Sequence, residues 1–194
     1  PNSVDLIVTD PPYGMGYVSN YYKNGNPHVA IEGDDHYPAE LIPVFKRLAK
    51  KAVFAFCRWD NLKEVEKPTS FIVWAKNNWT AGDLKHAYGR MWEGILFYPC
   101  EEHAFETRQP DIIDMRRVPP TKLHHPTEKP VELIKWIIRN NSNEGDLILD
   151  PFAGSGATLV ACQELKRRYI GIEVNEDYVN IIKKRLNNTQ GQLF

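Results

Sequence analysis

The chain has 194 residues, of which 42% are hydrophobic and 25% charged, and its formal net charge at pH 7 is -1. This size and apolar content suit one domain with a buried core, so we expect a single domain over residues 1–194, and the near-neutral charge excludes a global attraction to nucleic acid or membrane. Three scattered cysteines argue against a disulfide framework or a zinc site, and no apolar run reaches the roughly 18 residues that span a bilayer, so we expect a cytoplasmic protein without a resident metal.

The first predicted element is a strand at residues 4–9, VDLIVT, which ends at Asp10-Pro11-Pro12-Tyr13. Because proline cannot donate to a strand ladder, the two prolines end the strand and place an acid and an aromatic ring on a rigid corner. The stretch that follows is rich in Gly, Asn and Tyr and has neither a helical nor an alternating period. We expect a mobile loop at about residues 14–36.

The middle of the chain predicts one helix and three strands. Residues 38–51, PAELIPVFKRLAKK, carry apolar side chains at spacings of three and four, which is typical of an amphipathic helix. Short apolar runs at residues 52–57, 70–76 and 94–99 indicate strands.

The last third alternates helix and strand at short intervals. Such alternation predicts parallel βαβ units with right-handed crossovers, and therefore an α/β fold with a doubly wound, mostly parallel sheet. The expected helices lie at 130–141, 156–165 and 175–186, and the expected strands at 146–150 and 168–173.

A glycine-rich turn, DPFAGSGAT at residues 150–158, lies where a predicted strand ends and a helix begins. Gly154 and Gly156 allow a tight turn and a close approach of the backbone to a ligand, while Asp150 would repel a phosphate. Glu173 follows roughly 20 residues later, at the position where an acid accepts hydrogen bonds from ribose hydroxyls. A cationic adenosine such as S-adenosylmethionine suits both acids, and the alternative is a flavodoxin-like protein with a glycine turn and a chance glutamate.

Four motifs taken together, DPPY, HPTEKP (125–130), DPFAGSGAT and GIEVNED (171–177), closely resemble those of the amino-methyltransferases that act on DNA. Their order here resembles the permuted members of that family, in which the catalytic motif precedes the cofactor motif, and the resemblance covers nearly the whole chain. It implies a Rossmann-like methyltransferase fold, S-adenosylmethionine as cofactor, and double-stranded DNA as partner. The target base would leave the duplex and enter the pocket.

The resemblance assigns catalysis to Asp10, Pro11, Pro12 and Tyr13. An adenine N6 amino group is a poor nucleophile because its lone pair is delocalised into the ring. Two acceptors, the Asp10 side chain and the Pro11 carbonyl, would interrupt that conjugation by accepting hydrogen bonds from the two N–H groups. Because positive charge builds on the nitrogen during transfer, these acceptors would stabilise the transition state more than the ground state. Tyr13 would stack on the base.

The same resemblance assigns the cofactor to residues of the other motifs. Thr127 and Lys129 would contact the carboxylate of its methionine part. Tyrosines of the predicted loop, among them Tyr17, Tyr21 and Tyr22, are candidates to stack on the target base. The remaining cofactor residues are expected to be Asp150, Pro151, Phe152, Gly154, Ser155, Gly156, Glu173 and Val174.

Target recognition is expected at about residues 77–124. This region is short for that task, so either the recognition site is small, or a second subunit, as in a homodimer, or a missing segment would share the work. Its candidate contacts for phosphates or base edges are Trp79, Lys85, His86, Arg90, Arg108, Arg116, Arg117 and Lys122.

Two alternatives to a DNA adenine-N6 methyltransferase stay open. A cytosine-N4 enzyme faces the same chemical problem, although that group more often has serine in place of Asp10. A catalytically silent DNA-binding or regulatory subunit with the same fold is the other alternative, against which the intact DPPY motif argues.

Overall fold

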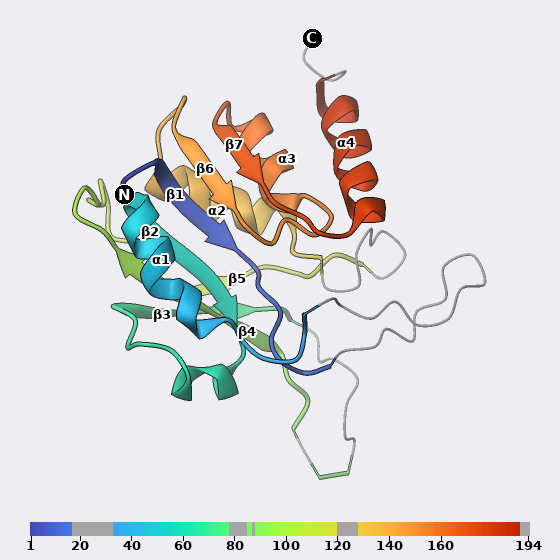
Figure 1. Ribbon diagram of the computed structural model, residues 1–194. Coiled ribbons are helices and arrows are strands. Elements are labelled where there is room, and N and C mark those ends of the chain that lie inside the picture. Colours follow the sequence, from blue (N-terminus) through green and yellow to red (C-terminus); the bar gives the residue numbers. More distant parts are fainter. Residues whose placement is uncertain (17–32, 78–84, 87, 120–127, 191–194) are drawn as a thin grey trace.

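A computed structural model describes residues 1–16, 33–77, 85–86, 88–119 and 128–190 of the chain. Within these residues the strands form one seven-stranded sheet with the order β5-β3-β4-β2-β1-β6-β7 (Figure 1). Only β4 runs against the others, so the sheet is mixed and mostly parallel. The strands are β1 (Val4–Thr9), β2 (Ala49–Cys57), β3 (Ser70–Ala75), β4 (Trp92–Pro99), β5 (Ile112–Asp114), β6 (Leu147–Asp150) and β7 (Arg168–Gly171).

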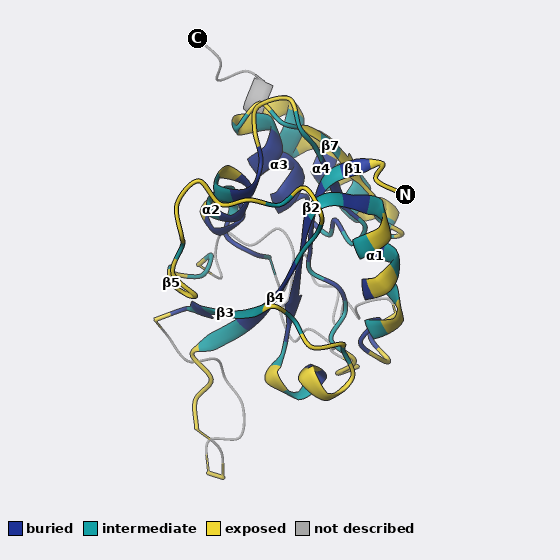
Figure 2. Cartoon of the chain, turned by 90° about the vertical axis from the view of Figure 1, so that its left-hand side faces the viewer, coloured by how far each residue is buried: buried dark blue, intermediate teal, exposed yellow. Residues whose placement is uncertain are grey.

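Helices cover both faces of this sheet. The α1 helix (Ile42–Leu48) packs on one face, and α2 (Val131–Asn141) and α3 (Ala157–Glu164) pack on the other, as Figure 2 shows. The α4 helix (Glu176–Gln190) packs against α3, and short 3-10 turns lie at Ala39–Leu41 and Trp59–Lys63. The predicted α/β, doubly wound fold is therefore confirmed.

The β1 strand lies inside the sheet and is buried on both faces. Leu6 and Val8 belong to the apolar cluster under α2 and α3, while Val4 and Ile7 belong to the cluster under α1. A parallel strand covered on both faces needs a nearly continuous apolar run, which VDLIVT supplies. Its carboxyl end is thereby fixed in the middle of the molecule.

The chain leaves β1 and β6 toward opposite sides of the sheet. From β1 it passes through α1 to β2, and from β6 it passes through α3, on the other face, to β7. Because β1 and β6 are neighbours, the two crossovers separate at their carboxyl ends. Open α/β sheets form a ligand-binding crevice at such a point.

The predicted helix over residues 38–51 is too long, since it ends at Leu48. Ala49 is extended, with ψ at 139°, and pairs with Val4 at the start of β2. The carbonyls of Lys50 and Lys51 also accept backbone amides that follow β4. These tertiary hydrogen bonds outweigh the helical propensity of the Ala-Lys-Lys sequence.

Other boundaries differ less. The β4 strand begins at Trp92, two residues before its predicted start, and β5 and the 3-10 turn at Trp59–Lys63 were not predicted. Residues 17–32 of the predicted loop lie outside the described residues, and the single-domain assignment stays a prediction. Among the helices described, none has the length and apolar character needed to cross a membrane.

Candidate functional site

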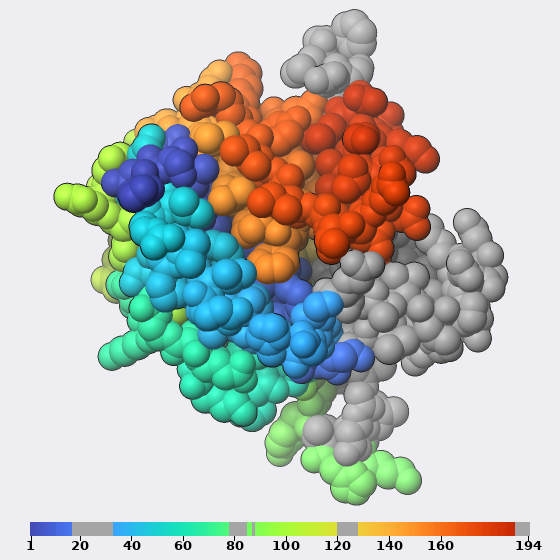
Figure 3. Space-filling view, in the orientation of Figure 1, coloured from blue at the N-terminus to red at the C-terminus, as the bar shows by residue number. Residues whose placement is uncertain are grey.

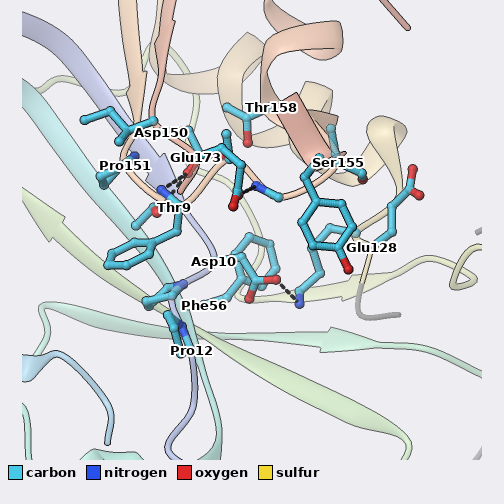
Figure 4. A pocket seen from close by; sticks show the side chains of 18 of the residues that line it. Thr9, Asp10, Pro12, Phe56, Glu128, Asp150, Pro151, Ser155, Thr158 and Glu173 are labelled. Carbon is cyan, nitrogen blue, oxygen red and sulfur yellow. Dashed lines mark hydrogen bonds and ion pairs between the residues drawn. The ribbon is translucent and has the colours of Figure 1, made fainter. Parts of the chain in front are cut away.

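Two sequence motifs that lie far apart in the chain meet at the carboxyl ends of β1 and β6. The hydroxyl of Thr9 donates to Asp150 Oδ1 at 2.9 Å, although the two residues are 141 positions apart (Figure 4). A cavity of about 350 Å³ opens at this point. Its lining includes Asp10, Pro11, Pro12, Tyr13, Phe56, Glu128, Lys129, Asp150, Pro151, Phe152, Gly154, Ser155, Thr158, Glu173, Val174 and Tyr178.

The space-filling view shows the surroundings of this region. In Figure 3 the blue atoms of the N-terminal segment reach the surface between the pale blue segment around α1 and the orange C-terminal third. The lining residues show that the catalytic corner and the glycine turn, predicted to act together, lie on one cavity.

Side chains from two other segments hold the corner after β1. Asn61, which is buried, donates from its amide nitrogen to the Tyr13 carbonyl at 3.1 Å. The buried carboxylate of Asp34 accepts the backbone amides of Gly14 at 2.7 Å and Met15 at 3.2 Å. The backbone of the corner is thus fixed beyond what the prolines alone provide.

Asp10 lies at the head of a buried polar network. Its Oδ2 accepts from Lys129 Nζ at 2.6 Å, and its Oδ1 accepts from the Tyr13 hydroxyl at 2.6 Å. Lys129 also lies 3.2 Å from Glu93 Oε2, and Lys76 Nζ lies 2.8 Å from Glu93 Oε1. The Lys129 ammonium further approaches the rings of Phe56 and Tyr13, with centroid distances of 5.1 and 5.4 Å.

Burial and charge act in opposite directions on these groups. Burial raises the pKa of Asp10, nearby Glu93 raises it further, and the Lys129 ammonium offsets only part of this effect. For Glu93, burial would raise the pKa, but Lys129 and Lys76 together lower it to about 2. Burial also raises the pKa of the Tyr13 hydroxyl, so this group acts as a hydrogen-bond donor.

The glycine turn and Glu173 form the opposite wall. The Gly154 amide donates to Glu173 Oε2 and the Asn175 amide donates to Glu173 Oε1, each at 2.8 Å. Gly156 has a φ of +85°, and a Cβ there would lie 2.9 Å from Ile182 Cγ1 of α4. A residue without a side chain is therefore required where the turn enters α3.

One arginine of α4 supports this wall through a hydrogen bond and an ion pair. Arg185 Nη1 donates to the Ser155 carbonyl at 2.9 Å and lies 2.8 Å from Glu128 Oε1. The same arginine thereby holds both the glycine turn and the segment that leads into α2. The basic sequence at residues 183–185 thus contributes Arg185 to the site itself.

Asp150 at the tip of β6 is almost fully buried. It accepts from Thr9 and from the Phe152 amide, at 3.1 Å for the latter. Burial raises its pKa to about 6, and these hydrogen bonds counteract only part of that rise. An acid of this kind gains from a cationic ligand, which would favour its ionised form.

Of the described residues that were predicted for catalysis or cofactor binding, all except Gly156 line one cavity. Lys129 was expected at the carboxylate of the cofactor, and its described partners are Asp10 and Glu93. Thr127, Tyr17, Tyr21, Tyr22, Trp79 and Lys122 lie outside the described residues. Of the predicted recognition residues, Lys85, His86, Arg90, Arg108 and Arg116 are exposed and Arg117 is half-buried.

The sequence analysis missed Glu93, Lys76, Asp34 and Asn61. None of them belongs to a motif, and each reaches the site from a different segment of the chain. One signal for a buried partner was available in the sequence: Glu93 is an acid that immediately precedes the apolar run at residues 94–99. Buried acids are rare unless they are paired.

Comparisons with known proteins agree on one family. The family model described as DNA methylase, for N6 and N4 enzymes, matches residues 4–184. The type II methyltransferase M.HpaI of Haemophilus parainfluenzae is 29% identical over 96% of this chain and 69% of that protein. The DNA adenine methyltransferase YhdJ of Escherichia coli is also 29% identical, over 95% of this chain and 76% of that protein.

Solved structures share the fold. The complex of M1.HpyAVI with SAM has a TM-score of 0.66 and 28% identity, over 94% of this chain and 89% of that one. The cytosine-N4-specific PvuII methyltransferase has a TM-score of 0.64 at 14% identity, over 96% of this chain and 86% of that one. The latter similarity concerns the fold alone.

Proposed function

The chain belongs to the DNA methylase family of N6 and N4 amino-methyltransferases, and from this premise we propose that it transfers a methyl group from S-adenosylmethionine to N6 of adenine in DNA. One observation carries the proposal. Asp10 and the first two residues of the glycine turn, Gly154 and Ser155, belong to separate motifs and line the same cavity.

The cavity suits S-adenosylmethionine, the methyl donor of this family. Its volume of about 350 Å³ is in the range of small-molecule sites, and carboxylates from Asp150 and Glu173 line it. The donor supplies an electrophilic methyl group on a sulfonium. In our proposal Glu173 accepts from the ribose hydroxyls, since each of its oxygens has a further lone pair beyond its bond to Gly154 or Asn175.

The corner after β1 acts on the other reactant. We assign the Asp10 carboxylate and the Pro11 carbonyl to the two N–H bonds of the amino group, so that the nitrogen lone pair leaves its conjugation with the ring. Because Asp34 and Asn61 fix the corner, the acceptors need little reorganisation when positive charge appears on nitrogen. Tyr13 and Phe56 offer aromatic surface on the same cavity.

Asp10 is also the reason for assigning adenine rather than cytosine. A carboxylate accepts more strongly from an amino group that gains positive charge than the neutral serine found more often in N4 enzymes. The similarity to a relative named as a DNA adenine methyltransferase supports the same assignment.

The remaining parts of the proposal concern DNA. The base must rotate out of the duplex to reach a cavity at the carboxyl ends of the strands. Exposed Arg90, Arg108 and Arg116 are candidates for the phosphate backbone. Assembly as a homodimer and a cytoplasmic location stay predictions.

The test is transfer of labelled methyl from S-adenosylmethionine to unmethylated DNA, followed by digestion to nucleosides and mass spectrometry. We expect N6-methyldeoxyadenosine. N4-methyldeoxycytidine would overturn the base assignment and leave the family reaction in place. DNA binding without heat of cofactor binding and without transfer would instead indicate a catalytically silent subunit.

A further inference from the structure

A buried row of alternating charges extends from Asp10 into the protein, and two of its members belong to no motif. Lys129 Nζ lies 2.6 Å from Asp10 Oδ2 and 3.2 Å from Glu93 Oε2. Lys76 Nζ lies 2.8 Å from Glu93 Oε1. The side chains of Lys76 and Lys129 are each 5% exposed, and those of Glu93 and Asp10 are 21% and 23% exposed, so water screens the two ammonium groups weakly and the two carboxylates only in part.

Resting on the proposed function, we propose that Glu93 is a positioning residue for methyl transfer. It holds the Lys129 ammonium against one oxygen of Asp10 and balances the charge of that ammonium. The Asp10 carboxylate is thereby oriented beside the target nitrogen, and the row as a whole stays neutral.

The positioning part follows from the segments that carry Glu93 and the two lysines. Lys129 lies at the entry to α2, Glu93 lies in β4, and Lys76 directly follows β3. A lysine side chain is long and flexible and makes a compact point charge, so one partner does not fix its direction. Glu93 comes from a strand that pairs on both sides, and it supplies the rigid second partner.

The charge part follows from the reaction. The bond between sulfur and the methyl carbon breaks and its electron pair stays on sulfur, while the lone pair of the amino nitrogen forms the new bond. Positive charge thus moves to a nitrogen beside Asp10, and the methylated amine afterwards releases one proton to water. An unbalanced ammonium behind Asp10 would oppose this movement, and Glu93 cancels it.

Glu93 and Lys129 have opposite effects on the ionisation of Asp10. The titratable groups that interact electrostatically with Asp10 are Tyr13 of its own segment, Tyr37 before α1, Lys129, Glu93, Cys57 at the end of β2 and Asp150 at the end of β6. Burial raises the pKa of Asp10, Glu93 adds to this rise, and Lys129 lowers it. Removing the charge of Glu93 therefore lowers the pKa of Asp10, and removing that of Lys129 raises it.

The experiment compares Glu93→Gln with Lys129→Met, at saturating S-adenosylmethionine and DNA. For Glu93→Gln we expect a decrease in kcat of about 10- to 100-fold, the range for hydrogen bonds to charged groups, with the Kd of S-adenosylmethionine unchanged. The acid limb of the pH profile moves to lower pH in Glu93→Gln and to higher pH in Lys129→Met. The double variant should lose less than the product of the two single losses, because it restores neutrality.

The matched control is Asp5→Asn. Asp5 also pairs with a lysine, Lys50 at 3.0 Å, and its side chain is 13% exposed, but it lies at the opposite end of β1. This variant also removes one carboxylate from an ion pair, here one that involves β1. An effect that comes only from a general loss of stability should therefore appear in this variant as well. We expect its kcat and acid limb to match those of the unsubstituted protein.

A second readout needs no activity. The Asp10 carboxyl is titrated by NMR in protein with ¹³C-labelled aspartate, and its signal is assigned by its loss in Asp10→Asn. If neither kcat nor this titration responds to Glu93→Gln, the inference is overturned. If the pKa of Asp10 shifts in opposite directions in the two variants but the unsubstituted protein transfers no methyl group, the charge arrangement is supported and the proposed function is overturned. If Glu93→Gln does not fold, Glu93→Gln with Lys76→Met removes the whole ion pair and gives the same readout.

Discussion

Replacing Asp10 by alanine tests the central chemical claim most directly. The substitution removes the proposed acceptor for the amino group and leaves the Pro11 carbonyl in place. It also removes the partner of two donors, the Tyr13 hydroxyl and the Lys129 ammonium, each at 2.6 Å. Both catalysis and stability should therefore change, by different amounts.

The magnitudes follow from these contacts. Loss of one preorganised group that stabilises transition-state charge lowers kcat by about 10²- to 10³-fold. Breaking a buried ion pair costs about 3–5 kcal/mol when the remaining charge has no partner. Lys129 still has Glu93 at 3.2 Å, so we expect the free energy of unfolding to fall by only about 1–3 kcal/mol.

The assay is single-turnover methyl transfer together with calorimetric binding of S-adenosylmethionine. Binding should persist, because the described partners of Glu173 are the Gly154 and Asn175 amides and none of them contacts Asp10. Asp5→Ala, which removes an ion-paired carboxylate from the other end of β1, is the control for lost stability.

Transfer by Asp10→Ala at a rate within tenfold of the unsubstituted protein would refute the assigned role. A loss of cofactor binding equal to the loss of transfer would refute it as well, because the site would then have failed as a whole. The prediction therefore requires a large effect on the chemical step and a small one on binding.

Three further predictions concern the turn, the β6 acid and the buried amide. Gly156→Ala should destabilise the protein more than Gly145→Ala when both are measured by denaturant unfolding. Both glycines have a φ of +85°, which costs alanine about 1–2 kcal/mol, but only at Gly156 would a Cβ meet a side chain of α4. Affinity for S-adenosylmethionine should fall as pH drops through about 6, where Asp150 takes up a proton, and calorimetry of Asp150→Asn should show a flatter profile. Asn61→Ala leaves the Tyr13 carbonyl without this donor, so thermal unfolding should show a loss of about 1–3 kcal/mol, and unchanged stability would contradict the role given to the amide.

The elements that carry the cavity were predictable from the sequence because each motif lies at the end of an apolar strand. The run before Asp10 and the run before Asp150 both mark buried parallel strands, and ligands bind at the carboxyl ends of such strands. The adjacency of β1 and β6 was not predicted and is known only from the structure. No local pattern states which two parallel strands pair across 141 positions.

What escaped prediction depends on tertiary contacts. Residues 49–51 have helical propensity, yet they join β2 because β1 and the segment after β4 offer hydrogen bonds to their backbone. Glu93 and Lys76 are single charged residues next to apolar runs, and their partnership requires that β3 and β4 lie side by side. Pairing of this kind is visible only once the sheet is assembled.

The position of β1 between β2 and β6 has a consequence for synthesis on the ribosome. The corner that begins with Asp10 is translated about 140 residues before the strand that completes its surroundings. A nascent chain holding only the first strands would present an open sheet edge, and such non-local closure is slow. We therefore expect the methyl-transfer pocket to be absent from incomplete chains and to form late, when the C-terminal third has left the exit tunnel.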